Sequence, residues 1–570
     1  MAVCIPGYTE CHTTDERKAA SIDKDNWWVA EKYALGIAMG YTAILIIVII
    51  VQYVKYLSFS KRMMRGTSLG FFNRIAAFCR AMHYNRLRLG GFYFPYTFPM
   101  LLLSFFFIWT TVWSFAVFPY YRAGIEWGSP PLGVRSGWMA LGLIVPVFAM
   151  GSRVNPISFL TGISHERLQV YHQYGAQIIL FLSVVHTIPF IIEPYQQGYQ
   201  LGGTKLARFF LKKYYDGTEQ FWNGIPPLVA LIWIVISSMG YFRKLNYEFF
   251  VIQHVVSTIF FLVWMFIHVD VMYPATWHHM FMATGVLIWS WVGRILITFW
   301  ANEFKWHDAQ LHSHADDIVR LRIITPLRWK PAQNIYLRFP TINIIESHPF
   351  TISSIPSLDV HSNSNIMQLL LRGKKGITGK LNSKAQSGKQ TIPVLIDGPY
   401  GGLPTPLDGY SRVLLLSGGT GVNANISILL DLMRKMERSE TLIEYIDFIW
   451  TIRSTESLDW FSQTFKQLSS YTSFDNLNIT IHITGNADVE KELVHDDKFY
   501  SFVKGRPDVK SIIRNTSAAA QGGDLAVSVC GPGDFMFDTM NECSSIELKI
   551  ATGDENLPRR LFAHSESYDW

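Results

Sequence analysis

The strongest constraint in this sequence is a pair of histidines that occurs twice, each time inside a long apolar run. His172 and His186 are 14 residues apart, and His254 and His268 have the same separation. On an α-helix this separation gives roughly 21 Å of rise, and the two side chains differ by only about 40° around the axis. Two such helices side by side would therefore present two facing histidine pairs at two depths. Because an ionisable residue inside a membrane helix is costly, it is usually functional.

Facing imidazoles at two depths suit two stacked bis-histidine haems, one near each face of a membrane. A single buried histidine is more often a hydrogen-bonded core residue, but the repeated spacing favours ligation here. The sequence therefore predicts that two haems b are bound by His172, His186, His254 and His268.

The composition separates two halves of the 570-residue chain. Only 16% of the residues are charged and 49% are hydrophobic, against about a quarter charged in ordinary soluble domains. The first 300 residues hold the long apolar runs, whereas the rest is typical of a soluble protein. By length and apolarity, seven spans are predicted, at about 34–54, 95–118, 137–151, 168–192, 224–241, 248–270 and 278–300.

Charge predicts the orientation of these spans. The connection 55–88 holds eight Lys and Arg residues and no acidic residue, which places it in the cytosol. The amino terminus is then exterior, and after seven crossings the carboxyl half is cytosolic. The basic residues of 193–223, predicted as an exterior loop, argue mildly against this orientation. The net charge of +6 is modest and unevenly placed, so no nucleic-acid binding is expected.

The second half alternates short apolar runs with turns, which is typical of β-strands. Ile318–Ile324 and Ile335–Phe339 are predicted strands, and the runs at 366–373 and 392–402 follow. Further along, the apolar stretch 413–416 runs into Ser-Gly-Gly-Thr-Gly and then into a predicted helix from Ile426. Glycines at a strand-to-helix turn allow the backbone to approach a phosphate group. The runs 445–454 and 525–534 are expected to extend the same parallel sheet.

The order of motifs then becomes informative. His-Pro-Phe-Thr at 348–351, Gly-Pro-Tyr-Gly-Gly at 398–402, Gly-Gly-Thr-Gly at 418–421, Trp450 with Arg453, and Cys-Gly-Pro at 530–532 follow the histidine pairs. This ordered set resembles the fungal ferric/cupric reductase family, which belongs with the NADPH oxidases in one superfamily of transmembrane flavocytochromes b. The resemblance extends from about residue 95 to the end.

The resemblance implies a membrane α-helical bundle with a di-haem core, followed by a cytosolic ferredoxin-reductase-like module. That module would consist of an FAD-binding β-barrel and an α/β nucleotide-binding domain. The implied segments are an exterior tail (1–33), a first span with the basic loop (34–94), a six-helix haem domain (95–303), the FAD domain (304–408) and the NAD(P)H domain (409–570).

The resemblance also assigns cofactor contacts, residue by residue. FAD would be bound by His348, Pro349, Phe350 and Thr351, with its pyrophosphate at Arg372, Gly376 and Thr378, and Trp570 would stack on the flavin. NADPH would be bound by Gly418, Gly419, Thr420, Gly421, Trp450, Arg453, Cys530, Gly531 and Pro532. The continuation Val422-Asn-Ala-Asn departs from many relatives, which have a small residue and a proline there. This departure leaves the choice between NADPH and NADH open, and Cys530 could also be a packed strand residue.

The expected activity is electron transfer from cytosolic NADPH through FAD and two haems b to an acceptor across the membrane. Ferric or cupric ions or chelates at the exterior face are the leading acceptors, with an iron or copper transporter acting downstream. The alternative is an NADPH oxidase that reduces dioxygen to superoxide. A transporter or receptor with an incidental flavin-like domain would contain no haem, and the apolar spans exclude a soluble flavin reductase. The expected location is the plasma membrane, with an endomembrane such as the vacuole as the alternative.

An exterior metal site is a further hypothesis. Asp270, His278 and His279 lie in and beside the short loop after His268. They could orient a metal acceptor near the outer haem. The alternative, interfacial polar residues that cap two helix ends, is favoured.

Overall fold

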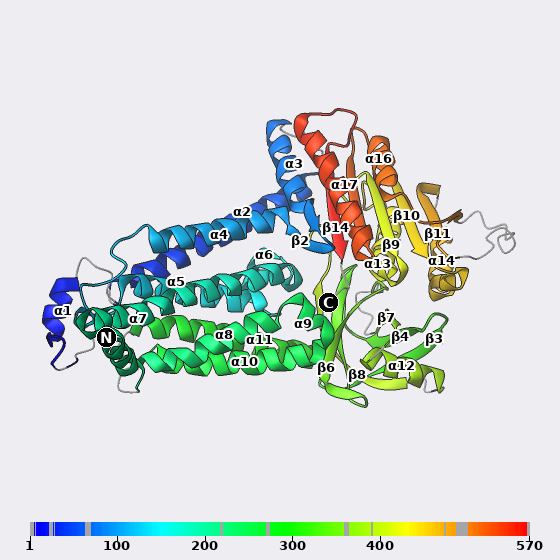
Figure 1. Cartoon of the computed structure of the whole chain (residues 1–570). Helices are drawn as coiled ribbons and strands as arrows, with labels where there is room; N and C mark the ends of the chain where they lie inside the picture. Colours follow the sequence, from blue (N-terminus) through cyan, green and yellow to red (C-terminus); the bar gives the residue numbers. More distant parts are fainter. Residues whose placement is uncertain are drawn as a thin grey trace. The chain divides into compact units, whose positions relative to one another are not determined.

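The structure, a computed structural model, is described for residues 5, 7–21, 27, 29–62, 70–216, 220–269, 274–357, 364–374, 376–388, 391–471, 475–485 and 500–566. The chain forms two compact units, each described by itself below. The helical unit comprises Met1–Gln52 and Met100–Gly293, and the sheet unit comprises Tyr53–Pro99 and Arg294–Trp570. Figure 1 labels many of the helices and strands of both units.

Helices account for the regular structure of the helical unit. They are α1 (Thr14–Ser21), α2 (Glu31–Arg62), α4 (Thr97–Phe115), η1 (Ile125–Trp127), α5 (Pro131–Gly151), α6 (Pro156–Thr161), α7 (His165–Tyr215), η2 (Gln220–Gly224), α8 (Ile225–Ser237), α9 (Gly240–Leu245), α10 (Tyr247–His268) and α11 (Pro274–Ala301). The ends of α2, α4 and α11 extend into the sheet unit.

Within the described residues, six helices are long and apolar enough to cross a membrane: α2, α4, α5, α7, α10 and α11. They fit an integral membrane protein. The remaining expected span, 224–241, corresponds to the shorter α8, which has 13 residues. The orientation expected from charge depends on an odd number of crossings, and it stays a prediction.

The segment 193–223 differs from the expected loop, because α7 continues as helix as far as Tyr215. The helical path is interrupted at Gly202 and Gly203, and Gly203 has a left-handed φ of 69°. The chain folds back there: a Cβ on Gly198 would lie 2.7 Å from the Cα of Ala207. Apolar residues follow the reversal, and Phe210 and Tyr214 form a small core with Ile125. The basic residues of this segment therefore lie on a helix, a possibility that the charge pattern alone did not indicate.

The core of the helical unit lies where α5 packs along α7 (Figure 1). Trp138 and Met139 of α5 and Leu182 of α7 are almost completely buried there. Most residues of α5 are buried, including Pro146. The core holds α5 and α7 side by side, which positions the histidines of α7 against the backbone of α5.

The first sheet of the sheet unit has six strands in the order β6-β5-β8-β3-β4-β7, and all neighbouring strands in it are antiparallel. The strands are β3 (His307–His314), β4 (Ile318–Thr325), β5 (Gln333–Phe339), β6 (Asn343–Thr351), β7 (Asn365–Arg372) and β8 (Thr391–Gly401), with α12 (Gly376–Gln386) between the last two. The strands predicted at 318, 335, 366 and 392 are confirmed.

The second sheet has six parallel strands in the order β12-β11-β10-β9-β13-β14. Its elements are β9 (Arg412–Gly418), η3 (Gly419–Gly421), α13 (Val422–Glu437), β10 (Tyr445–Ile452), η4 (Thr455–Phe461), α14 (Ser462–Leu468), β11 (Leu477–Ile483), β12 (Ser501–Lys504), α16 (Val509–Ala519), β13 (Asp524–Cys530), α17 (Gly533–Thr552) and β14 (Arg560–Glu566). The predicted extension of the sheet by 445–454 and 525–534 is confirmed. Both faces are buried, because Val413 and Leu415 enter one core and Leu414 and Leu416 the other.

An early segment of the chain completes the second of these cores. The connection 55–88, predicted as a basic loop, contains α3 (Gly70–Tyr84), and a hairpin of β1 (Arg86–Leu89) and β2 (Phe92–Tyr96) begins at its end. Helix α3 lies beside α17 (Figure 1). Ala77 and Tyr84 belong to the same core as Leu414 and Leu416. The α/β domain thus contains a segment from far outside 409–570.

Candidate functional site

The four histidines form two pairs, as their spacing predicts. The ring centroids of His172 on α7 and His254 on α10 are 6.2 Å apart, with an interplanar angle of 70°. Those of His186 and His268 are 6.1 Å apart, at 78°. Phe190 and Phe250 flank the two pairs, with centroids 5.1 Å from His186 and 5.3 Å from His254. The two helices therefore place the pairs at two levels, about 21 Å apart along the helix axis.

Backbone carbonyls of α5 orient the two histidines of α7. Nδ1 of His172 lies 2.8 Å from the carbonyl oxygen of Val147, and Nδ1 of His186 lies 2.7 Å from that of Gly133. Because a carbonyl oxygen only accepts, each Nδ1 carries the proton and donates it. Nε2 of each ring then keeps its lone pair, which is the form that binds a metal.

Side chains near α8 orient the two histidines of α10. Nδ1 of His268 lies 3.0 Å from Oδ1 of Asn223, whose Nδ2 donates to the carbonyl of Ile267. Nδ1 of His254 lies 3.2 Å from the Ser238 hydroxyl, which itself donates to the carbonyl of Ile234 at 2.6 Å. The Ser238 oxygen thus accepts from the ring. All four histidines therefore have a hydrogen-bonded Nδ1, as metal-binding histidines usually do.

The spacing of the rings agrees with this chemistry. Metal–imidazole bonds of about 2.0–2.1 Å place the centroids of two rings on opposite sides of one metal roughly 6 Å apart. Both pairs have this separation. The donor set, the tautomers and the spacing therefore fit two bis-histidine haem irons.

Two glycines of α5 allow the rings this close, and our sequence analysis missed them. A Cβ on Gly151 would lie 2.6 Å from Nδ1 of His172, and a Cβ on Gly137 would lie 2.6 Å from Nδ1 of His186. These glycines are 14 residues apart, as are the accepting carbonyls of Gly133 and Val147. The 14-residue spacing of the histidines on α7 therefore recurs in the glycines of α5. This shared spacing is the sequence feature that could have identified the two glycines.

Two of the three residues of the hypothetical exterior metal site, His278 and His279, lie in the described part of the chain. Asp270 lies outside the described residues. His278 is exposed on α11, whereas His279 is buried, with its ring centroid 6.3 Å from that of Trp138 and its Nδ1 against the carbonyl of Ala275. Consecutive helical residues point about 100° apart, so these two rings face different surroundings.

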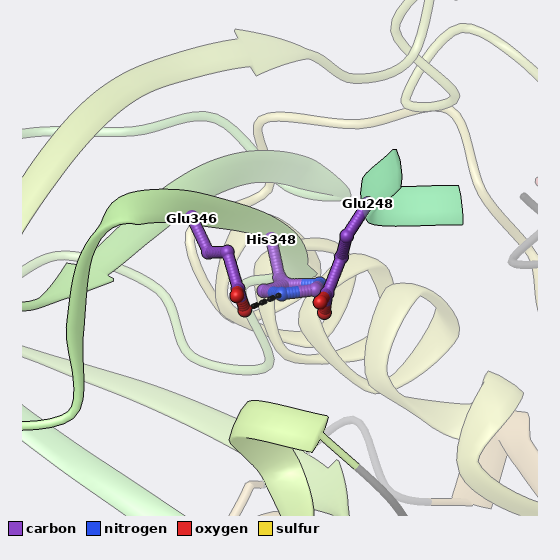
Figure 2. Close-up of side chains that lie close together, drawn as sticks. All are labelled: Glu248, Glu346 and His348. Atoms are coloured by element: carbon purple, nitrogen blue, oxygen red, sulfur yellow. Dashed lines mark ion pairs between the residues drawn. The ribbon is translucent and has the colours of Figure 1, made fainter. Parts of the chain in front are cut away.

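In the sheet unit, the predicted flavin motif lies on β6. His348 pairs with Leu337 and Phe350 pairs with Ile335 across the β5–β6 register. Figure 2 shows the His348 ring beside the Glu346 carboxylate, with Nε2 and Oε2 3.7 Å apart; the figure also labels Glu248, which belongs to α10 in the helical unit. Thr351, the hydroxyl residue of the motif, is buried at the end of the strand.

The predicted pyrophosphate region lies at the start of α12. Arg372 is the exposed last residue of β7, and Gly376 begins α12 with a left-handed φ of 59°. An open pocket beside this helix is lined by Gly376, Gly379, Lys380, Lys384 and residues of the β5–β6 turn. A helix amino terminus with cationic neighbours is a favourable place for a phosphate group.

The two predicted nucleotide motifs lie against each other. A Cβ on Gly418 would lie 2.7 Å from Cδ of Pro532, and a Cβ on Gly421 would collide with the carbonyl of Cys530. Gly419 has a left-handed φ of 55°. The glycine turn that precedes α13 and the Cys530–Pro532 segment that precedes α17 thus form one edge of the parallel sheet. Ligands bind at this carboxyl edge in open α/β sheets.

Trp450 and Arg453 have different positions at this edge. Trp450 is completely buried, and its Nε1 donates a 3.0 Å hydrogen bond to the carbonyl of Gly419. This hydrogen bond from the buried indole stabilises the glycine turn. Arg453 is exposed just after β10 ends at Ile452. Its guanidinium is accessible to a phosphate group.

The remaining predicted residues lie in the core or outside the description. Cys530 is completely buried among apolar residues at the end of β13. Trp570 lies outside the described residues. The unusual Asn425 ties two strands together, because its Nδ2 donates to the carbonyl of Leu416 and its Oδ1 accepts from Ser528.

Comparison with known proteins agrees with this arrangement. The family described as "Ferric reductase like transmembrane component" matches residues 136–265, an FAD-binding domain family matches 302–403, and "Ferric reductase NAD binding domain" matches 410–544. Two of the three matching families, one in each half of the chain, are thus described as parts of ferric reductases. The first match covers most of α5, all of α6–α9 and most of α10. The FAD-binding match covers the first sheet, and the NAD-binding match covers the second sheet except β14.

Fungal ferric reductases are similar over most of this chain. The probable cell surface ferric reductase kap2 of Aspergillus oryzae is 29% identical over 404 residues, 69% of this chain and 53% of that protein. Ferric/cupric reductase transmembrane component 7 of Saccharomyces cerevisiae is 28% identical over 64% of this chain and 56% of its own length. The chain thus spans little more than half the length of these relatives.

Proposed function

We propose that this chain transfers electrons across a membrane, from cytosolic NADPH through FAD and two haems b to ferric or cupric ions or chelates on the opposite side. The proposal rests on one observation: the four histidines form two facing pairs, whose ring centroids are 6.1 and 6.2 Å apart. Every Nδ1 has a hydrogen-bond partner, which leaves Nε2 for a metal. Bound FAD would accept the two electrons of a hydride and release them singly, as haem iron requires.

The residues of the helical unit have defined tasks in this proposal. His172 with His254 would hold the haem nearer the cytosol, and His186 with His268 the outer one. The carbonyls of Val147 and Gly133 keep the α7 imidazoles in the ligating tautomer. Because the hydrocarbon core is about 30 Å thick, two sites about 21 Å apart along a helix cover most of the distance.

The residues of the sheet unit would bind and order the two nucleotides. His348–Thr351 on β6 would line the flavin, with its pyrophosphate near Arg372 and α12. The glycine turn 418–421 and the amino terminus of α13 would bind the pyrophosphate of NADPH. Arg453 would contact the 2′-phosphate, for which a planar guanidinium is well suited. The names of both relatives support a metal acceptor, and that of the Aspergillus oryzae protein is consistent with action at a cell surface.

The haem assignment is tested by spectroscopy of the purified full-length chain. We expect a low-spin b-type difference spectrum after dithionite reduction, with two haems per chain. His172→Ala combined with His254→Ala should remove one haem and leave the other, and His278→Ala, at an exposed helical position, should retain both. A chain that contains no haem would contradict the proposal.

The direction and the acceptor are tested in sealed vesicles. With NADPH outside and a ferric chelate with a ferrous indicator inside, we expect Fe(II) to form in vesicles whose cytosolic side faces outward. Superoxide dismutase in the lumen should leave the rate of Fe(II) formation unchanged. If Fe(II) formation requires dioxygen and is abolished by superoxide dismutase, the protein is instead an oxidase that produces superoxide.

A further inference from the structure

Helix α3 of the sheet unit has two chemically different faces. Ala77, Ala81 and Tyr84 are buried. Four large apolar side chains of the same helix are exposed: Phe71, Phe72, Ile75 and Phe78. Phe71 is exposed by 71%. At about 100° per residue, the exposed set covers an arc of about 120° on the side opposite the buried set. This apolar arc, residues 71, 72, 75 and 78, is called the outer face of α3 below.

Polar contacts fix the rotation of α3 about its axis. Arg80 donates from Nε and Nη2 to both carboxylate oxygens of Glu547, at 2.6 and 3.0 Å. The Ser544 hydroxyl donates to the carbonyl of Ala81 at 2.8 Å, and the Tyr84 hydroxyl accepts from the amide of Ala563 at 3.0 Å. All of these bonds lie on the inner side of α3. The helix therefore cannot turn its outer face toward the α/β domain without breaking them.

The adjoining hairpin also combines exposed apolar groups with cations. Leu89 and Phe92 are exposed at its turn. Arg88 binds Asp534, in the first turn of α17, with Nη1 2.8 Å from Oδ1, and the Tyr93 hydroxyl donates to the same oxygen. The hairpin is thus fixed to the α/β domain while its tip stays exposed.

Position in the chain and charge indicate what covers these apolar groups. The segment 63–96 lies between α2 and α4, two helices long and apolar enough to cross a membrane, so both of its ends are tied to expected spans. From Lys55 to Tyr96 there are eight Lys and Arg residues and no Asp or Glu. Arg80 and Arg88 are paired with carboxylates of α17, and the attraction to lipid is argued from the other six. A basic residue near an anionic bilayer is attracted to its lipid headgroups. Helices with such an apolar face and basic flanks lie in the lipid headgroup region.

We propose that α3 lies on an anionic bilayer surface, with the outer face in the boundary between headgroups and acyl chains. Because the inner face is fixed to α17 and β14, α3 then anchors the nucleotide-binding α/β domain directly to the membrane. The proposal requires that the chain spans a membrane, but it is independent of the haems and of the acceptor. Four adjacent large apolar side chains exposed to water are unfavourable, and such patches usually mark a surface that contacts a membrane or a partner.

Cys79 provides a reporter on this helix. It is a free, exposed cysteine on α3, whereas Cys530 and Cys543 are buried and Cys11 is disulfide-bonded. We would label the full-length chain at Cys79 with an environment-sensitive fluorophore in nanodiscs of phosphatidylcholine and phosphatidylglycerol. The matched control is Cys79→Ser with Asn515→Cys, which moves the label to an exposed position on α16. Cys79→Ser alone measures background labelling.

We expect blue-shifted emission at Cys79 and strong quenching by lipids that carry a nitroxide near the headgroup, with neither effect at position 515. Phe72→Ser combined with Phe78→Ser should reduce the quenching. Emission and quenching equal to those of position 515 would overturn the proposal. Lipid-independent shielding that requires two chains per nanodisc would overturn it in favour of a second copy as the partner. The haem spectrum of the same sample separates this result from a failure of the proposed function.

Discussion

The Arg80 guanidinium and the Glu547 carboxylate form a bidentate ion pair across 467 residues of sequence. Glu547 is completely buried, and one of its oxygens also accepts from the amide of Leu561 at 3.1 Å. The pair joins α3 to α17 and β14 within the α/β domain. Burial raises the pKa of the Glu547 carboxyl, and the adjacent Arg80 opposes this effect. Neither charge is therefore well accommodated without the other.

Removal of one partner should destabilise the α/β domain strongly. Arg80→Met would leave a buried carboxylate without its cation, which costs about 3–5 kcal/mol. The double variant Arg80→Met with Glu547→Met should recover much of this loss. Thermal unfolding of the full-length chain, followed by release of flavin fluorescence, measures both effects. The control is Arg88→Met, because Arg88 pairs with Asp534 and both of these side chains are exposed; it should have a smaller effect.

The close approach of α5 to the histidines gives a second prediction. Gly151→Ala would place a Cβ 2.6 Å from Nδ1 of His172, so the ring must shift away from the carbonyl of Val147. We expect loss of one of two haems per chain, or a changed spectrum of that haem, measured by haem quantification and electron paramagnetic resonance. Gly285→Ala is the matched control, since a Cβ there meets no atom within 4 Å. Equal spectra for both variants would show that the glycine is not needed for haem binding.

The support of the glycine turn by Trp450 gives a third prediction. Trp450→Phe removes the hydrogen bond to the carbonyl of Gly419 and retains most of the buried ring. A hydrogen bond of this kind contributes about 0.5–1.5 kcal/mol, so the KM for NADPH should rise by up to roughly tenfold, with a smaller change in kcat. Trp460→Phe is the control, because Nε1 of Trp460 has no hydrogen-bond partner among the described residues. If the two variants have the same KM, the turn does not depend on this bond.

Arg453 should decide the preference between the two nicotinamide nucleotides. Its exposed guanidinium follows β10 at the carboxyl edge of the sheet. Arg453→Ala should raise the KM for NADPH and leave the KM for NADH nearly unchanged, because only NADPH carries the 2′-phosphate. Arg438→Ala, at an exposed position after α13, should change neither. Steady-state kinetics with both nucleotides measure the ratio, and an unchanged ratio would remove Arg453 from the site.

Local pattern predicted most of the strands correctly, for a simple reason. Val413–Leu416 is apolar at every position because both faces of a parallel sheet are covered, and the structure buries all four residues. The run 193–223 misled us, because its glycines and basic residues are typical of a loop. Only the packing of Phe210 and Tyr214 against Ile125 shows why it is helical.

The amphipathic α3 was missed for a different reason. Its buried residues, Ala77 and Tyr84, join a core formed by strands more than 300 positions later in the chain. Among eight basic residues, nothing local distinguishes Arg80 as the one that pairs with a completely buried carboxylate. Its partner Glu547 is likewise one of several acidic residues of α17. Local sequence cannot show such a partnership, because it depends on which surfaces meet after folding.

The sequence by itself determined the period of the histidines, and with it their two levels and their common helix face, because helical rise and turn are constants of the backbone. It also determined the order of the strand and turn motifs that indicate the family. The tertiary structure decided which nitrogen of each ring is left for a metal, because the carbonyls of α5 and the polar groups near α8 come from other helices. It also decided that α3 belongs to the α/β domain, because burial of Ala77, Tyr84 and the Arg80–Glu547 pair requires surfaces that are distant in sequence.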